Sequence, residues 1–317
     1  MVLFAGRRVL QALPLLLGVT FVAFLMINAV PGGPLSAYEN NPGITPQDIQ
    51  RLQHTLGLDQ PIWIRYLQWL RHFLTGDWGY SYAAHRPVLT MIGERIGNTL
   101  LLMGTVYVIT LLIAIPIGLF TAVRQYSRAD YGVTFLAFAG LSMPTFWLGL
   151  LLIIVFGLGL GIFPLGGMST PGASFDLFDR LHHLVLPVAT LSLVGVAHYT
   201  RYLRASTLEV LTQDYIRTAR AKGLAEEVVL LRHAFRNAAL PLVTVAALDL
   251  PELFAGALVT EQIFGWPGMG RLFWDSATRS DYPVLMGIVT VSATMIIAAN
   301  LLADLVHAWL DPRVRPH

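Results

Sequence analysis

The chain has 317 residues, of which 55% are hydrophobic and only 13% are Asp, Glu, Lys or Arg. Because soluble globular proteins carry about 25% charged residues and cannot bury most of a long apolar chain, this composition excludes a water-soluble protein. The absence of cysteine excludes disulfides, thiolate metal sites and a cysteine nucleophile. The net charge is only +2 and the basic residues are not concentrated in one soluble domain, which argues against a nucleic-acid partner.

Six apolar segments are long enough to cross a bilayer as helices, which takes about 20 residues. The first lacks a small-residue cleavage site, so we interpret it as an uncleaved membrane anchor. The third is 31 residues long and contains Pro144, so it is either one tilted, kinked helix or two short ones. The six segments are residues 9–30, 99–123, 133–163, 184–203, 238–260 and 284–310.

Basic residues decide how the third segment is counted, because cytoplasmic loops of membrane proteins are enriched in Lys and Arg. Two spans in the third segment would put the basic loop 204–237 outside, whereas one span places every arginine-rich end on the same side. We therefore predict an all-α membrane protein with six transmembrane helices and both termini cytoplasmic. The flanking basic residues are Arg7, Arg8, Arg124, Arg128, Arg313 and Arg315.

This topology divides the chain into three regions. Residues 1–30 form the N-terminus and the first transmembrane helix, and residues 31–98 form an extracytoplasmic helical insertion. Residues 99–317 form the main transmembrane domain, which contains the other five helices and the cytoplasmic loop 204–237.

The insertion contains signals for two helices. Thr45 followed by Pro46 is typical of a helix start, and Gly57 of a helix end. In residues 61–74 apolar side chains recur at helical spacing with basic and amide residues between them, which predicts an amphipathic helix that ends at Gly76. This helix lies against the membrane face or a partner, or it only packs the insertion together.

The most informative segment is the inside loop. Residues 201–237 hold seven basic and four acidic residues. A helix is predicted over 214–222, with an acid in its first turn and bases in its last turn, and it ends at Gly223. A second helix is predicted over 226–236. Isolated helices this short are marginally stable in water, so we expect them to dock against another protein; the alternative is a solvated basic loop attracted to anionic lipid headgroups.

Several runs of sequence match a known family pattern in the right order, and together they cover nearly the whole chain. The runs are LGLDQPIWIRYLQWL, SMPTFWLGLLLI, DYIRTARAKGL, RHAFRNAALPLVT, TEQIFGWPGMGR, DYP and DPR. In these runs the chain resembles the permease subunits of bacterial ABC importers for dipeptides, oligopeptides and nickel (the DppB/OppB type). The broader family has Glu-Ala-Ala where Arg217, Thr218 and Ala219 stand here, a departure similar to that of the peptide-importer variant.

The resemblance implies a multi-pass protein of the bacterial plasma (inner) membrane that forms half of the translocation pathway for di- or oligopeptides. It also implies four partners: a second, similar permease (DppC/OppC-like), two ABC ATPase subunits and an extracytoplasmic substrate-binding protein. By position, the ATPase-coupling segment would consist of Asp214, Tyr215, Arg217, Thr218, Ala219, Arg220, Ala221, Lys222, Gly223 and Leu224. In this segment Gly223 would permit the turn, and Ala219 and Ala221 would allow the ATPase to approach closely. The basic residues Arg217, Arg220 and Lys222 would make polar contacts with it.

The sequence also indicates that ATP is hydrolysed by another polypeptide. A phosphate-binding P-loop needs Gly-Lys-Ser or Gly-Lys-Thr, and the single lysine of the chain, Lys222, follows Ala221 and precedes Gly223. ATP and Mg²⁺ would therefore be used by partner subunits, with no cofactor or metal bound by this chain. We find no catalytic constellation, and we interpret His182 and His183 as surface residues of an outside loop. The alternative function is a self-sufficient channel or ion-coupled carrier.

Two acids in the fifth apolar segment, Asp249 and Glu252, are three positions apart and are expected to share a helix face. Ionisable groups at membrane depth usually face an aqueous path or a partner. We therefore predict that they line the translocation pathway, where they would attract a substrate's ammonium group; alternatively, an arginine of the partner permease neutralises them.

Two further groups are candidates for pathway and gate. Pro144 breaks the backbone hydrogen bonding of its segment, which makes it a candidate hinge or pore-facing kink, although a packing kink is the commoner explanation. The run of glycines and prolines after the fifth segment suits a tight cap over the outer mouth. The pathway residues are Ser142, Met143 and Pro144, and the outer-gate residues are Glu261, Trp266 and Pro267.

Overall fold

The computed structural model describes residues 2–30, 45, 47, 51, 53–54, 57, 59–252 and 257–310. Helices make up the described part of the chain, which contains no strand beyond an isolated bridge between Tyr80 and Pro87. The chain divides into two compact units, which we call the first unit (Met1–Thr99 with Pro267–Leu301) and the second unit (Leu100–Trp266 with Leu302–His317).

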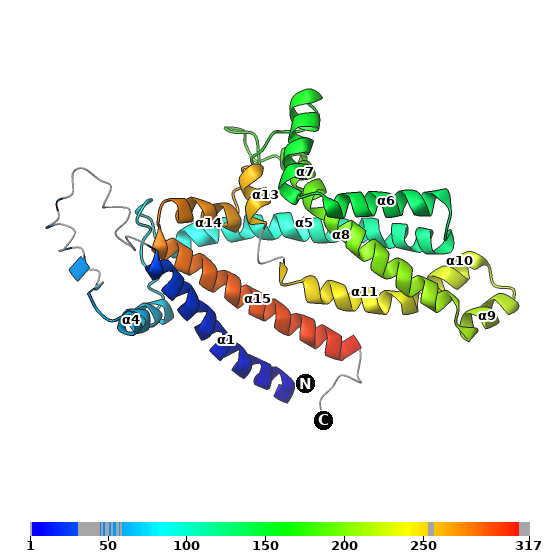
Figure 1. The fold of residues 1–317 in the computed structure, drawn as a ribbon, viewed down its shortest axis with the longest axis horizontal. Helices are drawn as coiled ribbons and strands as arrows, with labels where there is room; N and C mark the ends of the chain where they lie inside the picture. Colours follow the sequence, from blue (N-terminus) through cyan, green and yellow to red (C-terminus); the bar gives the residue numbers. More distant parts are fainter. Residues whose placement is uncertain are drawn as a thin grey trace. The chain divides into compact units, whose positions relative to one another are not determined.

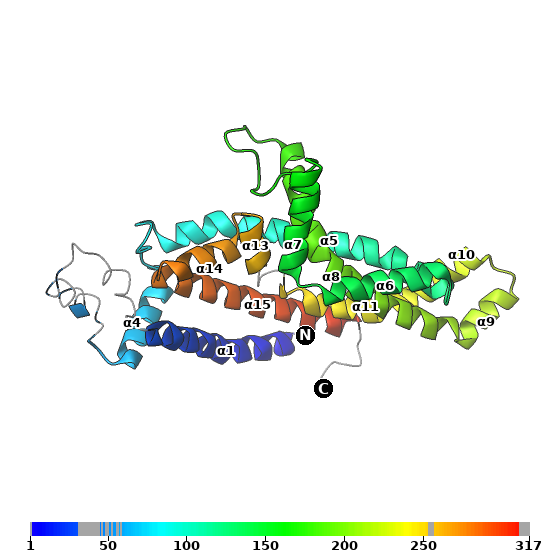
Figure 2. The same ribbon diagram turned by 45° about the horizontal axis from the view of Figure 1, so that its top comes forward.

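The first unit is built on helix α1, with α4 packed beside the end of α1 that leads toward it (Figures 1 and 2). Phe24 of α1, Tyr66 of α4 and Met286 of α15 form a buried cluster, and the Tyr66 hydroxyl shares a hydrogen bond of 2.9 Å with that of Thr20. The amphipathic helix predicted over 61–74 is confirmed as α4. The helices that contribute to this unit are α1 (Val2–Ala29), α4 (Ile62–Leu74), the start of α5 (Val88–Val123), α14 (Met269–Thr278) and most of α15 (Tyr282–Leu310).

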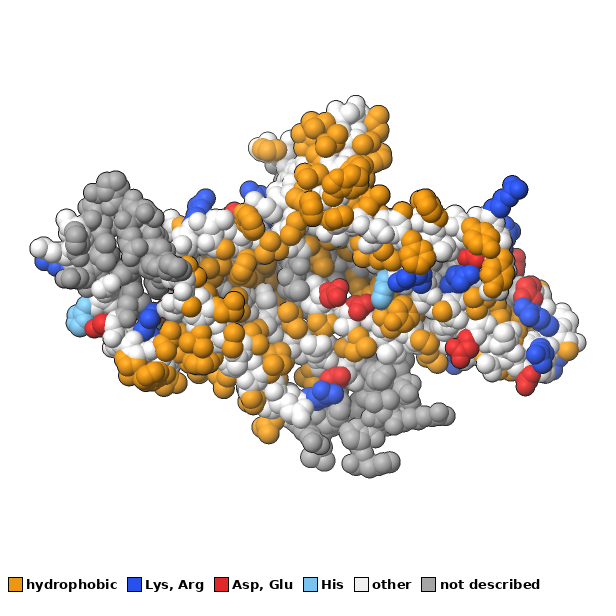
Figure 3. Space-filling view, in the orientation of Figure 1, with side chains coloured by type: hydrophobic (Ala, Val, Ile, Leu, Met, Phe, Trp, Pro, Cys, Tyr) orange, Lys and Arg blue, Asp and Glu red, His pale blue; other side chains and the backbone are white. Residues whose placement is uncertain are grey.

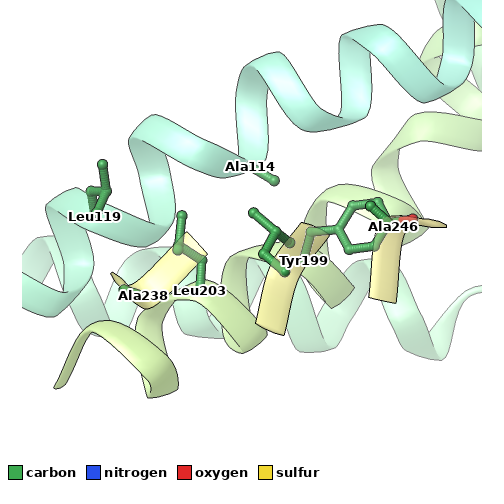
Figure 4. Close-up of a cluster of buried hydrophobic side chains, with 7 residues drawn as sticks. Ala114, Leu119, Tyr199, Leu203, Ala238 and Ala246 are labelled. Atoms are coloured by element: carbon green, nitrogen blue, oxygen red, sulfur yellow. The ribbon is translucent and has the colours of Figure 1, made fainter. Parts of the chain in front are cut away.

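The second unit is a bundle in which α6 and α11 both pack along α8 (Figures 1 and 2). Its core joins Ala114 of α5 to Tyr199 and Leu203 of α8 and Ala246 of α11, as Figure 4 shows. Besides the rest of α5, its helices are α6 (Arg128–Ser142), α7 (Thr145–Leu152), η2 (Ile153–Gly159), α8 (Leu177–Leu211), α9 (Asp214–Ala221), α10 (Glu226–Val228), η3 (Val229–Ala234), α11 (Phe235–Asp249) and α13 (Leu258–Ile263).

Small residues let these helices approach closely, as is common where helices pack in a membrane. A Cβ atom at Gly118 of α5 would lie 3.0 Å from the Leu203 Cβ of α8, and one at Gly140 of α6 would lie 3.1 Å from Leu193 Cγ. The close α5–α8 and α6–α8 contacts therefore depend on glycine, which has no side chain, at positions 118 and 140.

Five described helices are long and apolar enough to cross a membrane, or six if the bent pair Arg128–Ser142 and Thr145–Gly159 forms one broken span. The pair is bent by 105°, and Figure 2 shows α7 turning sharply away from α6. The third segment is therefore broken into two helices at Pro144, which the sequence singled out, and the predicted count of six spans holds if the pair forms one broken span.

The boundaries of the other spans differ from the predicted ones. The second and fourth helices are longer, at Val88–Val123 and Leu177–Leu211. The predicted fifth span over 238–260 is wrong at both ends, because the helix runs from Glu226 to Asp249. Pro241 lies inside this helix, whereas Pro251 follows its end and has no N–H with which to continue the helical hydrogen bonds. The helix predicted to start at Thr45 and Pro46 lies largely outside the described residues.

Candidate functional site

The segment that links α8 to α11 forms a helix, a tight turn and a second helix. Helix α9 covers Asp214–Ala221, close to the predicted 214–222. Gly223 follows with a φ of +76°, and its N–H donates to the Arg220 carbonyl at 2.9 Å. A Cβ atom there would contact nothing within 4 Å, so the backbone conformation, not lack of space, makes glycine necessary.

One face of α9 packs on the helix that follows the turn. Ile216 and Ala219 are buried against Val229 and Ala234 of η3, and Ala219 is only 6% exposed. Ala219 thus belongs to the interior of this small core, and Ala221, which is exposed, is the alanine at the surface. This core holds α9 in place. It stabilises a helix that would be only marginally stable if it were isolated in water.

The opposite face and the whole turn are open. All residues from 220 to 228 are exposed, including apolar Leu224 and Val228, each 40% exposed. Figure 3 shows charged side chains gathered at the end of the second unit that carries α9 and α10, whereas hydrophobic side chains cover much of the surface elsewhere. An exposed patch that mixes apolar and charged residues on a firmly seated turn is suited to binding another protein.

Two arginines of α9 behave differently. Arg220 makes a bidentate pair with Glu226 across the turn, at 3.1 Å from Nε and 2.5 Å from an Nη atom, and this hydrogen bonding raises the pKa of the guanidinium. Arg217 reaches Asp214 at 3.3 Å, but both side chains are largely exposed. Arg220 therefore closes the turn, whereas Arg217, with Lys222, is the more available cation.

Replacing Arg220 with Gln is expected to lower the free energy of unfolding by at most about 1 kcal/mol, because exposed ion pairs contribute little even in good geometry. The loss should shrink at about 1 M salt, which screens exposed charges. Thermal unfolding of the purified protein at low and high salt checks this. A large, salt-independent loss would contradict the assignment of this pair as an exposed clasp.

An ion pair that the sequence did not predict joins the first turn of α6 to the C-terminal third of α8. Arg204 of α8 donates to both carboxylate oxygens of Asp130, at 2.9 and 2.8 Å, and Asp130 is only 3% exposed. The Tyr126 N–H donates to the same carboxylate at 2.9 Å, and the Asp130 N–H donates to Ser127 Oγ at 3.1 Å. A Ser followed three positions later by an acid is a helix-start signal, so the local cap was detectable, but not the partner on α8.

The predicted pathway residues lie on separate elements. Asp249 is the last residue of α11 and accepts a hydrogen bond of 2.6 Å from the Tyr199 hydroxyl of α8. Glu252 follows Pro251 and is exposed. The two acids do not lie on one continuous fifth helix, because α11 ends at Asp249, but both lie close enough to the Tyr199 hydroxyl to interact with it electrostatically.

The other predicted pathway residues mark the bend. The break between α6 and α7 falls at Met143, which follows Ser142 and precedes Pro144. All three are exposed, and the Ser142 hydroxyl donates to the Phe138 carbonyl at 2.8 Å, within its own helix.

The predicted gate residues are anchored. Glu261 and Trp266 are both 0% exposed, and Trp266 packs in a cluster with Val106 of α5 and Leu184 of α8. The Pro267 carbonyl accepts from Asn98 Nδ2 at 2.8 Å. The loop predicted as a cap thus supplies an interior tryptophan to the bundle.

His182 and His183 are not residues of a surface loop, contrary to the prediction, because both lie on α8. His183 is 7% exposed and lies 2.8 Å from the Asp179 carbonyl through Nδ1. His182 Nε2 lies 2.8 Å from the Ile162 carbonyl. Among the described residues, no group of three or more His, Cys, Asp or Glu side chains is placed to hold a metal ion.

Comparison with known proteins identifies the family. Residues 114–316 match the family of the binding-protein-dependent transport system inner membrane component, and residues 1–103 match the N-terminal region of such membrane components. The chain belongs to this permease family. The permease is therefore a multi-pass plasma-membrane protein that works as a transport component, with other subunits, of an ABC transport system.

Relatives align with the permease over almost its full length. It is 45% identical to the oligopeptide transport system permease protein AppB of Bacillus subtilis, over 97% of this chain and 98% of the relative. It is 40% identical to a putative peptide permease protein of Brucella ovis, over 98% of each chain. It is 38% identical to the dipeptide transport system permease protein DppB of Escherichia coli, over 99% of each chain.

Proposed function

We propose that this permease is one membrane-spanning half of an ATP-driven importer for di- or oligopeptides. Near-complete alignment with proteins named oligopeptide and dipeptide permeases supports the cargo class. In this proposal six spans place both termini in the cytoplasm and the insertion 31–98 outside. The other half is a similar permease, and an extracytoplasmic binding protein delivers the peptide.

Energy would enter through the α9–α10 turn, which we assign as the docking site for an ATPase subunit. The observation that carries this assignment is the exposed turn at Gly223, seated by the Ile216 cluster directly after α8. Two ATPase subunits would bind ATP and Mg²⁺, because a chain whose single lysine is Lys222 lacks a P-loop.

Replacing Leu224 with Asp should reduce recovery of the ATPase subunits with the permease by about tenfold or more, since a carboxylate buried in a protein contact without a partner is costly. The measurement is co-purification from membranes that express the whole importer, combined with ATP-dependent peptide uptake in vesicles. Leu177→Asp is the matched control: Leu177 is also exposed, at 61%, but lies at the opposite end of α8.

Full ATPase recovery with Leu224→Asp, or equal losses with both variants, would contradict the assignment of the turn. Peptide transport by the purified permease alone in liposomes, without ATPases, would instead favour a self-sufficient carrier and overturn the importer function.

A further inference from the structure

The first unit encloses a cavity of about 540 Å³ between α1, α4, the loop before α5 and the start of α15. Its lining combines aromatic rings with polar side chains, and all of it comes from this one unit. A pocket of this size falls within the range of small-molecule sites, in which apolar walls surround a few directed polar groups. None of the functions assigned above uses it.

One polar group of this lining is unsatisfied. Tyr282, at the start of α15, is 7% exposed, and its hydroxyl has no hydrogen-bond partner among the residues that the structure describes. A buried polar group without a partner is costly, so buried hydroxyls are normally bonded. The Tyr282 ring lines the cavity, whereas its hydroxyl is covered by protein atoms and does not face the cavity.

A positive charge in the same lining forms no ion pair among the described residues, since the acid of the lining, Asp77, accepts from the Gly79 N–H at 3.1 Å. The Arg65 guanidinium donates to Asn28 Oδ1 and lies 5.9 Å from the centre of the Phe24 ring. No carboxylate of the described residues lies within 4.0 Å of Arg65 to form an ion pair. Since guanidinium always carries its charge and suits bidentate binding of carboxylate or phosphate, the cavity favours an anionic group beside Arg65.

The remaining walls indicate what the anion is attached to. Trp69 and Trp78 line the cavity and are joined through Phe73, with ring centroids 5.4 and 4.4 Å apart, which provides a rigid apolar wall. Gln60 and Gln68 add amide groups, and Gln68 Nε2 donates to Gln60 Oε1 at 2.9 Å. Such amides match peptide N–H and C=O groups, whereas a lipid acyl chain would bury them without partners.

We propose that this cavity binds the C-terminal end of a short peptide. The terminal carboxylate pairs with Arg65, and the last side chain packs on Trp69 and Trp78. The choice of a peptide over another amphiphilic anion rests on the proposed function. The cavity lies outside the α9–α10 turn, so this is a separate site.

The test measures binding of a fluorescently labelled tripeptide, labelled at its N-terminus and ending in Phe, to the full chain in phosphatidylcholine nanodiscs. Arg65→Gln is expected to weaken binding about tenfold or more, the range for loss of a charge-assisted pair. The same peptide with a C-terminal amide should bind as weakly, and Arg65→Gln should not weaken it further.

Arg71→Gln serves as the matched control, because Arg71 lies on the same helix, is exposed and is absent from the lining. It should bind the free acid normally. Arg65→Lys, which keeps the charge, should retain part of the affinity and shows that a loss in Arg65→Gln is not misfolding.

Equal affinity for the acid and the amide, or normal binding by Arg65→Gln, overturns the proposal. So does a phospholipid that co-purifies with the wild-type chain, is lost from Arg65→Gln and blocks the peptide, because the cavity is then a lipid site. If peptide binding fails while Leu224→Asp still releases the ATPases, this inference falls and the importer function stands.

Discussion

Replacing Asp130 with Ala is expected to lower the free energy of unfolding by about 3–5 kcal/mol, the usual result when one partner of a buried ion pair is removed. The carboxylate is 3% exposed and accepts two N–H bonds from Arg204 and one from the Tyr126 backbone. Without it, the Arg204 guanidinium, whose side chain is 28% exposed, loses its counter-ion. Thermal unfolding of the purified permease, with peptide uptake measured in parallel, checks this expectation.

A double variant separates the pair from general damage to the helix ends. Asp130→Leu combined with Arg204→Met removes both charges and should be more stable than either single variant, since well-packed apolar replacements of buried pairs are often neutral. If the effects of the two single changes simply add, the bidentate contact does not stabilise the protein and the expectation fails.

The second large effect is expected at Asp281, directly before α15. This carboxylate is 2% exposed and accepts from the Ser81 hydroxyl, from the Tyr82 N–H at 3.0 Å and from the Ala83 N–H at 3.4 Å. Asp281→Ala leaves these donors without an acceptor and should cost about 3 kcal/mol or more, because hydrogen bonds to charged groups contribute about 1.5–3 kcal/mol each.

The loss should appear as a lower unfolding temperature and as faster chymotryptic cleavage in the loop that contains Tyr80 and Tyr82. Asp281→Asn keeps one acceptor oxygen and should lose less. Asp275→Ala, which removes an exposed carboxylate of the preceding helix α14, should change the unfolding temperature little. If Asp275→Ala and Asp281→Ala are equally destabilising, the carboxylate of Asp281 does not anchor the loop.

Local signals predicted the local structure well. Apolar length identified the membrane helices, Gly223 marked the turn after α9, and apolar residues that recur at helical spacing identified α4. The ends of the spans were less predictable, because hydropathy does not register amphipathic extensions such as the start of α5, where Val88 and Ile92 pack in the core of the first unit.

Long-range contacts could not be predicted from one sequence. The Asp130–Arg204 pair joins residues 74 positions apart, and no periodicity relates them. Trp266 was assigned to a gate from loop composition, yet it is a core residue, because glycine and proline show where a chain turns and not what the next side chain contacts. The family resemblance assigned Ala219 to close approach at an interface, although its own helix pair covers it. The roles assigned to the coupling, pathway and gate residues stay predictions.

The Asp130–Arg204 pair couples the C-terminal part of α8 to α6, so that a tilt of this part of α8 would move α6 with it. From Pro187 to Leu211 the helix is about 36 Å long at 1.5 Å per residue, so a tilt of about 5° would displace its end by about 3 Å. Arg204 lies seven residues before that end, and Asp130 would be carried along with it. The opposite end of α6 is the 105° bend at Met143. A change in the angle of this bend can accommodate the displacement of α6, so α7 need not move with it.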